Sequence, residues 1–195
     1  PYWIAYRNLR LNQKKRYMLS AQLSYDITDW LNISGRVRVD NTHTKYEQKL
    51  YASSNLTITE ESTQGHYTIS KPDETQTYAD VLANINKRFN DFSLVANVGA
   101  SIVNNRYEDL SYRGPIREKG IPNVFNVFDL DNTKKKARQD EWQEQTQSVF
   151  ASVEVGWKSM LYLTLTGRND WASQLANSST PCFFYPSVGL SGVIS

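Results

Sequence analysis

This sequence of 195 residues is poor in cysteine and has no long hydrophobic run. Its one cysteine, Cys182, excludes an intramolecular disulfide and a thiolate-based metal site. A membrane-spanning helix needs about 20 consecutive apolar residues, and no segment approaches that length, so a helical membrane protein is excluded. The 22 basic and 20 acidic residues leave a net charge of +2, which is too small to indicate a nucleic-acid partner.

Motifs of enzymes and of metal sites are also missing. There is no Gly-x-Ser-x-Gly elbow, no glycine-rich phosphate loop and no His-Glu-x-x-His pair. His43 and His66 are far apart, each in loop-like surroundings, with no second imidazole or thiolate at ligand spacing. Residues 129–133 are similar to a calcium loop, but Lys134 stands where that loop needs glycine. We therefore predict neither an enzyme nor a bound cofactor or metal.

What the sequence does have is an alternation of apolar and polar residues with a period of two. In residues 31–40, Ile33 and Val37 fall on one side of the expected strand, whereas Arg36 and Arg38 fall on the other. The alternation recurs in six more segments, at residues 17–27, 78–86, 92–102, 148–157, 161–170 and 187–195. These segments predict about seven strands, and residues 2–8 are considered as an eighth.

The connections alternate strictly between short and long. Short ones at residues 28–30, 90–91 and 158–159 are separated by long polar stretches at residues 41–76, 104–146 and 170–184. Aromatic residues flank each short connection: Tyr25 and Trp30, Phe89 and Phe92, Trp157 and Tyr162. Outer-membrane barrels have short periplasmic turns, long extracellular loops and aromatic girdles. The expected fold is all-β, an antiparallel up-and-down transmembrane β-barrel segment of about seven or eight strands.

Periodicity alone does not tell which face of a strand is wet. A soluble or surface-exposed β-sandwich that binds glycans or protein partners is therefore the alternative.

Several segments resemble the SusC/RagA family of TonB-linked outer-membrane transporters. The most specific is residues 163–173, a strand that ends with Arg168, Asp170 and a nearby serine, followed after a spacer by a Tyr-Pro-Ser strand start at residues 185–187. Two further segments are similar to the family's periplasmic turns and to one of its large extracellular loops: residues 25–33 and residues 120–126. The resemblance runs nearly end to end but covers only a central stretch of the family's barrel.

The resemblance implies that residues 1–195 are part of a larger TonB-dependent receptor-type barrel domain of roughly 22 strands. The plug domain, the remaining strands, the TonB box and the signal peptide are expected outside this sequence. It further implies a multi-pass barrel in the Gram-negative outer membrane that imports oligosaccharides or peptides with TonB-derived energy. The implied partners are a SusD-like surface lipoprotein, TonB through the N-terminal region and outer-membrane lipid, with no nucleic acid.

Two sets of residues are candidates for function. Polar residues expected to contact the lumen or the plug are Arg36, Arg38, Arg168 and Asp170. Aromatic residues expected in long loops are candidates for ligand or lid contact, although packing within the loops is the simpler interpretation: Tyr107, Tyr112, Phe125, Phe128 and Trp142. The basic run at residues 134–138 is interpreted as a solvated loop face, with contact to an acidic lid protein or lipopolysaccharide phosphates as the alternative.

Overall fold

A computed structural model describes residues 6–193, which form eight strands and one short 3-10 helix. These elements are β1 (Arg10–Thr28), β2 (Leu31–Tyr51), β3 (Gly65–Ser70), β4 (Asp73–Phe89), β5 (Phe92–Pro115), β6 (Lys136–Trp157), β7 (Leu161–Ala172), η1 (Ser173–Leu175) and β8 (Cys182–Gly192). Six of the predicted alternating segments are strands, and so are residues 187–192 of the seventh, whose last residues, 194–195, lie outside the described residues. Of the eighth segment considered, residues 2–5 lie outside the described residues and residues 6–8 are not in a strand.

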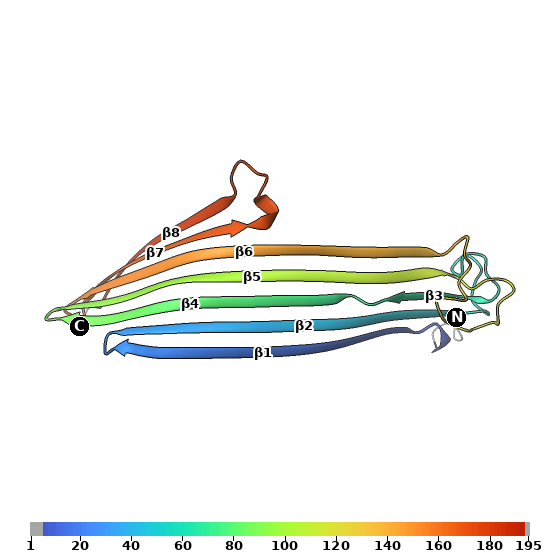
Figure 1. Cartoon of the computed structure of the whole chain (residues 1–195), viewed down its shortest axis with the longest axis horizontal. Helices are drawn as coiled ribbons and strands as arrows, with labels where there is room; N and C mark the ends of the chain where they lie inside the picture. Colours follow the sequence, from blue (N-terminus) through green and yellow to red (C-terminus); the bar gives the residue numbers. More distant parts are fainter. Residues whose placement is uncertain (1–5, 194–195) are drawn as a thin grey trace. The chain divides into compact units, whose positions relative to one another are not determined.

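The strands belong to one sheet in the order β1-β2-β3-β5-β6-β7-β8, in which β4 pairs with β2 and β5, the same neighbours as β3 (Figure 1). Pro72 lies between β3 and β4, and proline has no N–H for the ladder. The register nevertheless continues across it, because Tyr46 pairs with Ser70 and the Thr44 N–H donates to the Pro72 carbonyl at 2.9 Å. β3 and β4 are therefore one interrupted strand, and the up-and-down connectivity is confirmed. A single sheet also contradicts the β-sandwich alternative, which requires two.

The chain divides into two compact units, and β1, β2, β4, β5 and β6 contribute residues to both. Residues 1–17, 41–75 and 106–142 form the first, which we call the loop unit because it contains the connections 52–64 and 116–135. Residues 18–40, 76–105 and 143–195 form the second, which we call the turn unit because it contains the three short turns.

Strands of the turn unit have one apolar face and one polar face, as the alternation predicts. Registers keep the apolar residues in rows: Leu163 pairs with Leu190, and Leu165 pairs with Val188. This apolar face is exposed, with side chains 41–73% accessible at Val37, Val81, Val98, Val149, Leu163 and Val188. So large an exposed apolar face marks a surface that meets lipid or another protein.

The short turns are confirmed at residues 29–30, 90–91 and 158–160. Asn90, Lys158 and Ser159 have positive φ angles of 48°, 51° and 57°, which are the left-handed conformations that tight hairpins use. Lysine ammonium groups lie over the aromatic rings beside these turns, with Lys87 Nζ 5.0 Å from the Trp30 ring centroid. Exposed rings with lysines at one end of a sheet are typical of a membrane interface.

The three long connections are shorter than the sequence predicts. Much of residues 41–76 and 104–146 is strand, because β2 extends to Tyr51, β5 to Pro115 and β6 starts at Lys136. The third long connection shrinks from residues 170–184 to residues 173–181. In the loop unit both faces of these strands are polar. The backbone hydrogen bonding between strands therefore continues beyond the point where the alternation of apolar and polar residues stops.

A small apolar core lies beneath the connections of the loop unit. Ile116 and Leu130 are 1% and 0% exposed and form an isolated antiparallel bridge. Gly65 starts β3 with φ of +115°, and a Cβ there would lie 2.6 Å from the Leu50 carbonyl oxygen. Only glycine fits this entry into β3 without strain.

Candidate functional site

Arg36, on the polar face of β2 in the turn unit, is held by β4. Its Nη2 lies 2.7 Å from Asp80 Oδ2, and its Nε donates to the same oxygen at 2.9 Å. The guanidinium also lies over the Tyr78 ring, 5.3 Å from the centroid. The Arg38 guanidinium also lies over this ring, 5.6 Å from the Tyr78 centroid. Both predicted arginines therefore lie on one face, held by one tyrosine.

A chain of amide and carboxylate side chains crosses the polar face from Arg38. Arg38 Nη2 donates to Gln76 Oε1 at 3.4 Å, and Gln76 Nε2 donates to Asn105 Oδ1 at 2.9 Å. Asn105 Nδ2 then donates to Glu144 Oε1 at 2.9 Å, and Glu144 accepts a hydrogen bond from Gln174. The chain joins β2, β4, β5, β6 and the connection after β7. We call these five residues the polar ladder.

Arg168 and Asp170 form a second cluster on the polar face. Arg168 Nε donates to Asp170 Oδ1 at 2.7 Å, and Arg168 Nη2 donates to Ser148 Oγ at 3.2 Å. Ser148 is buried and pairs in register with Asp170 across β6 and β7. Arg168 and Asp170 therefore contact each other, and Arg168 also contacts β6.

Three of the five predicted loop aromatics lie on strands instead of loops: Tyr107 and Tyr112 on β5 and Trp142 on β6. Tyr107 and Trp142 stack with their centroids 5.6 Å apart and an interplanar angle of 13°. The expectation of a loop position was wrong because polar residues on both strand faces were interpreted as loop.

The two aromatic residues that do lie in a loop behave differently. Phe125 packs edge-on against Tyr51, with centroids 5.0 Å apart, and against Tyr67 at 6.0 Å. Its role within the loop unit is packing. Phe128 is 82% exposed, and the Arg117 guanidinium lies 5.6 Å from its centroid.

A cavity of about 640 Å³ opens on the loop unit. Residues from β2, β3, β5 and the connection 52–64 line it, together with Asn8 and Arg10. Along β2 and β3 the lining residues are the even-numbered ones, such as Gln48, His66 and Thr68, and Gln48 pairs in register with Thr68. These residues therefore share one face of the strands.

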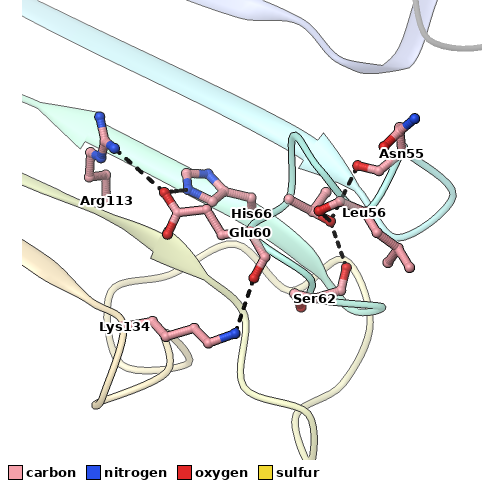
Figure 2. Close-up of polar contacts among 8 residues, drawn as sticks. Asn55, Leu56, Glu60, Ser62, His66, Arg113 and Lys134 are labelled. Carbon is pink, nitrogen blue, oxygen red and sulfur yellow. Dashed lines mark hydrogen bonds and ion pairs between the residues drawn. The ribbon is translucent and has the colours of Figure 1, made fainter.

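Glu60 is the centre of the charged contacts in this cavity. Figure 2 shows its carboxylate between His66 and Arg113: Oε1 lies 3.6 Å from His66 Nε2 and 3.5 Å from Arg113 Nη2. His66 is 6% exposed, and burial lowers its pKa despite the neighbouring carboxylate, so the imidazole is neutral at pH 7. Its Nδ1 is buried without a hydrogen-bond partner among residues 6–193.

The backbone that presents Glu60 is strained and pinned. Glu60 and Glu61 have φ angles of 52° and 68°, a conformation that costs about 1–3 kcal/mol at each non-glycine residue. Lys134 Nζ donates to the Glu60 carbonyl at 3.3 Å (Figure 2). The same Nζ lies 3.4 Å from Glu61 Oε2. Ser62 Oγ donates to the Ile116 carbonyl at 2.7 Å. The surrounding loop thus compensates the strain with contacts from the connection 116–135.

Lys134 is itself positioned by a turn at Asp131. Thr133 donates its N–H to Asp131 Oδ1 at 2.8 Å, and the N–H of Lys134 donates to the Asp131 carbonyl at 3.3 Å. The hydroxyl and N–H of Thr133 lower the pKa of Asp131. Part of the basic run is therefore structural, since Lys134 anchors the connection 52–64.

The opposite face of the loop unit holds a buried carboxylate, that of Glu47. Tyr67 donates its hydroxyl to Glu47 Oε1 at 2.8 Å, and Lys45 Nζ and Lys49 Nζ lie 3.1 and 3.3 Å from the same carboxylate. Burial alone would raise the pKa of Glu47, but the hydrogen bonds from Tyr67 and the lysines lower it overall. This cluster is satisfied internally and has no free group to offer a ligand.

Within residues 6–193 no group of three or more His, Cys, Asp and Glu side chains is placed to hold a metal ion. No helix in the same part of the chain has the length and apolar character needed to cross a membrane. His43 and His66 both lie on strands, contrary to the loop positions expected, and His43 pairs with Asp73.

The residues around the cavity were not predicted as a site. Arg10, Glu60, His66 and Arg113 are spread over more than 100 positions, and nothing in their spacing predicts that they meet. The spacing of two between His66 and Thr68 puts them on one side of a strand, but residues 41–76 were expected to be a long connection.

Comparison with known proteins identifies the architecture. Residues 1–191 match the family model described as TonB dependent receptor-like, beta-barrel. A structure of the RagAB peptide transporter is similar, with a TM-score of 0.78 and 15% identity over 97% of this chain and 21% of that chain. The RagAB peptide importer in its 'open-open' state gives a TM-score of 0.75 at 15% identity, over 97% of this chain and 20% of that chain.

The likeness extends beyond RagAB. The siderophore receptor PiuA from Acinetobacter baumannii gives a TM-score of 0.56 at 14% identity, over 95% of this chain and 30% of that chain. The chain spans about a fifth of the length of the RagAB chains it matches. No curated protein matches the sequence.

Proposed function

Because the chain belongs to the TonB-dependent receptor-like β-barrel family of the Gram-negative outer membrane, we propose that it forms barrel wall in an importer of oligosaccharides or peptides. TonB supplies the energy, acting through a plug domain in another part of the protein. Residues 1–195 are then one stretch of the barrel domain. The resemblance to SusC/RagA transporters is confirmed at the level of the family and of the fold.

The two faces of the turn unit carry this proposal. Apolar side chains are exposed on one face. The other face carries three hydrogen-bonded groups of polar side chains: Arg36 with Asp80, the polar ladder, and Arg168 with Asp170. A transmembrane strand needs about 9–11 residues, and β2 contributes 10 residues, 31–40, to the turn unit. The apolar face then meets lipid and the polar face borders the lumen.

The loop unit supplies the extracellular part in this proposal. Its strands are polar on both faces, which fits backbone that continues into water beyond the outer leaflet. The stacked pair Tyr107 and Trp142 is a candidate platform for a sugar ring or a peptide side chain. Phe128, exposed beside Arg117, is the candidate for contact with a lid.

The proposed partner outside the cell is a SusD-like surface lipoprotein that closes over the substrate. Support comes from the likeness to the RagAB transporter, whose description names peptides as cargo. Identity of 15% carries the fold only, so both oligosaccharides and peptides are proposed as substrates.

Cysteine accessibility tests the assignment of the two faces. In a Cys182→Ser background of the full-length protein, Val149→Cys and Ser152→Cys place a thiol on opposite faces of β6. A membrane-impermeant maleimide added to outer-membrane vesicles should label Ser152→Cys and leave Val149→Cys unlabelled until detergent is added. Equal labelling of the two thiols in intact vesicles would contradict the barrel orientation.

Uptake tests the transport itself. Cells that express the full-length gene should accumulate labelled oligosaccharides or peptides, and loss of TonB or of the gene should abolish the accumulation. Uptake that persists without TonB would rule out the proposed energy source.

A further inference from the structure

The residues that line the cavity share one face of the loop-unit strands. Gln48 pairs in register with Thr68, and the pairing between β2 and β3 is unshifted over residues 46–51, so Gln48, His66 and Thr68 lie on the same side. A molecule that enters the cavity would meet these side chains.

The cavity has one cation whose charge is not compensated. Arg113 and His66 both face the carboxylate of Glu60, which satisfies Arg113 at 3.5 Å. Arg10 lines the same cavity and has no ion pair or hydrogen bond within residues 6–193. Counting Arg10, Arg113 and Glu60 with a neutral His66, the lining has a net charge of +1.

Neutral donors surround this cation. Gln48, Thr68 and Tyr46 line the cavity, and their side chains make no hydrogen bond to another described side chain. An amide, a hydroxyl and a phenol are therefore free to donate to an oxygen-rich group. Arginine presents two parallel N–H groups that match the two oxygens of a carboxylate.

We propose that this cavity binds a carboxylate of the transported molecule, with Arg10 as its cationic anchor and Gln48 and Thr68 as neutral donors. A single net positive charge matches the single negative charge of a carboxylate, whereas a phosphate monoester carries about −1.5 to −2 at pH 7. Glu60 occupies Arg113 and leaves Arg10 as the anchor. Leu50 and Ile58 supply the apolar part of the lining beside the charged group.

This inference rests on the proposed import function, because only an importer would bring a transported molecule to the cavity. Its test measures binding and does not require transport. Two sources of the carboxylate are the C-terminus of a peptide and the uronic acid of an acidic oligosaccharide. Purified full-length protein in detergent is titrated with a mixed-sequence tetrapeptide and its C-terminal amide, and with tetragalacturonate and neutral galactotetraose.

We expect at least one carboxylate probe to bind about tenfold more tightly than its neutral match, the effect of one charge-assisted hydrogen bond. Arg10→Gln should remove that preference, and Arg10→Lys should restore part of it. Arg106→Gln is the matched control, because Arg106 is an arginine of the same unit that lines a different cavity, with Glu108 and Glu141 as its partners. Heat-modifiable migration on a gel establishes that each variant is folded.

Three outcomes decide the matter. Preference for the peptide acid or for the uronate supports the proposal and identifies the source. Equal binding of acid and neutral probes, or an unchanged preference in Arg10→Gln, overturns it. Because binding is measured without TonB, carboxylate binding without uptake would contradict the import function alone, and uptake of neutral molecules without carboxylate preference would contradict this inference alone.

Discussion

Gly99 on the polar face of β5 is a position where one added methyl group should destabilise the barrel. A Cβ at Gly99 would lie 2.7 Å from both Cε2 and Cζ of Phe150 on β6 and 2.8 Å from the Val81 carbonyl oxygen on β4. Carbon atoms in good contact are about 3.5–4.0 Å apart, so the methyl group is roughly 0.8 Å too close to the ring. The phenyl ring can rotate away, but the carbonyl belongs to the β4–β5 ladder and cannot move without disturbing it.

The expected magnitude follows from this geometry. Overpacking by one methyl group costs about 1–3 kcal/mol, and we expect Gly99→Ala to fall in that range. Gly35→Ala is the matched control, because its Cβ would find only the Asp80 carbonyl, at 3.7 Å. Alanine loses less backbone entropy on folding than glycine, so this variant should be unchanged or more stable by about 0.5–1 kcal/mol.

Denaturant unfolding of the full-length protein in lipid vesicles measures both variants. Tryptophan fluorescence follows unfolding, and the heat-modifiable band on a gel gives an independent measure of the folded barrel. Adding Phe150→Leu to Gly99→Ala should recover part of the loss, since it removes the ring but leaves the Val81 carbonyl. If Gly99→Ala unfolds at the same denaturant concentration as Gly35→Ala, the packing of Phe150 over Gly99 is not what the structure indicates.

Three further changes test other contacts. Asp80→Asn should lower barrel stability slightly, because the solvent-exposed Arg36 exchanges a charged acceptor for a neutral one; a lower unfolding midpoint in vesicles measures it. Burial lowers the pKa of His66, so the unfolded loop unit binds a proton more readily than the folded one and stability falls as the pH drops below about 6.5. Amide-exchange protection of residues 52–66 should therefore be lower at about pH 5.5 than at about pH 7.5, and a difference that persists in His66→Gln would contradict the assignment. Lys134→Ala should speed glutamyl-endopeptidase cleavage in the connection 52–64 by about twofold to fivefold, because it frees the backbone there, whereas Lys135→Ala should not.

The turn unit could be predicted from the sequence almost entirely. Its strands alternate apolar and polar residues because lipid and lumen lie on opposite sides, and alternation is what a sequence displays. The positions of Arg36 and Arg168 on the polar face follow from the same pattern. Their partners do not, because Asp80 and Ser148 are assigned only when the strand registers are known.

Prediction stopped where both faces of a strand become polar. Tyr107 and Trp142 were expected in loops because nothing in the hydropathy of residues 104–146 distinguishes a solvated strand from a loop. The cavity was missed for a related reason. Glu60 reaches His66 and Arg113 through two consecutive left-handed residues, and neither glutamate is a residue type that signals that conformation.

The uninterrupted register across Pro72 has a consequence for how this barrel tolerates changes in length. Successive side chains on a strand point to opposite faces of the sheet. Deletion or insertion of one residue at positions 71–72 would therefore move every side chain on one side of the break to the other face. His66 and Thr68 would then point away from the cavity, and Tyr67 would replace them. A change of two residues preserves the phase. Length variants that keep the barrel folded should therefore differ at this interruption by an even number of residues.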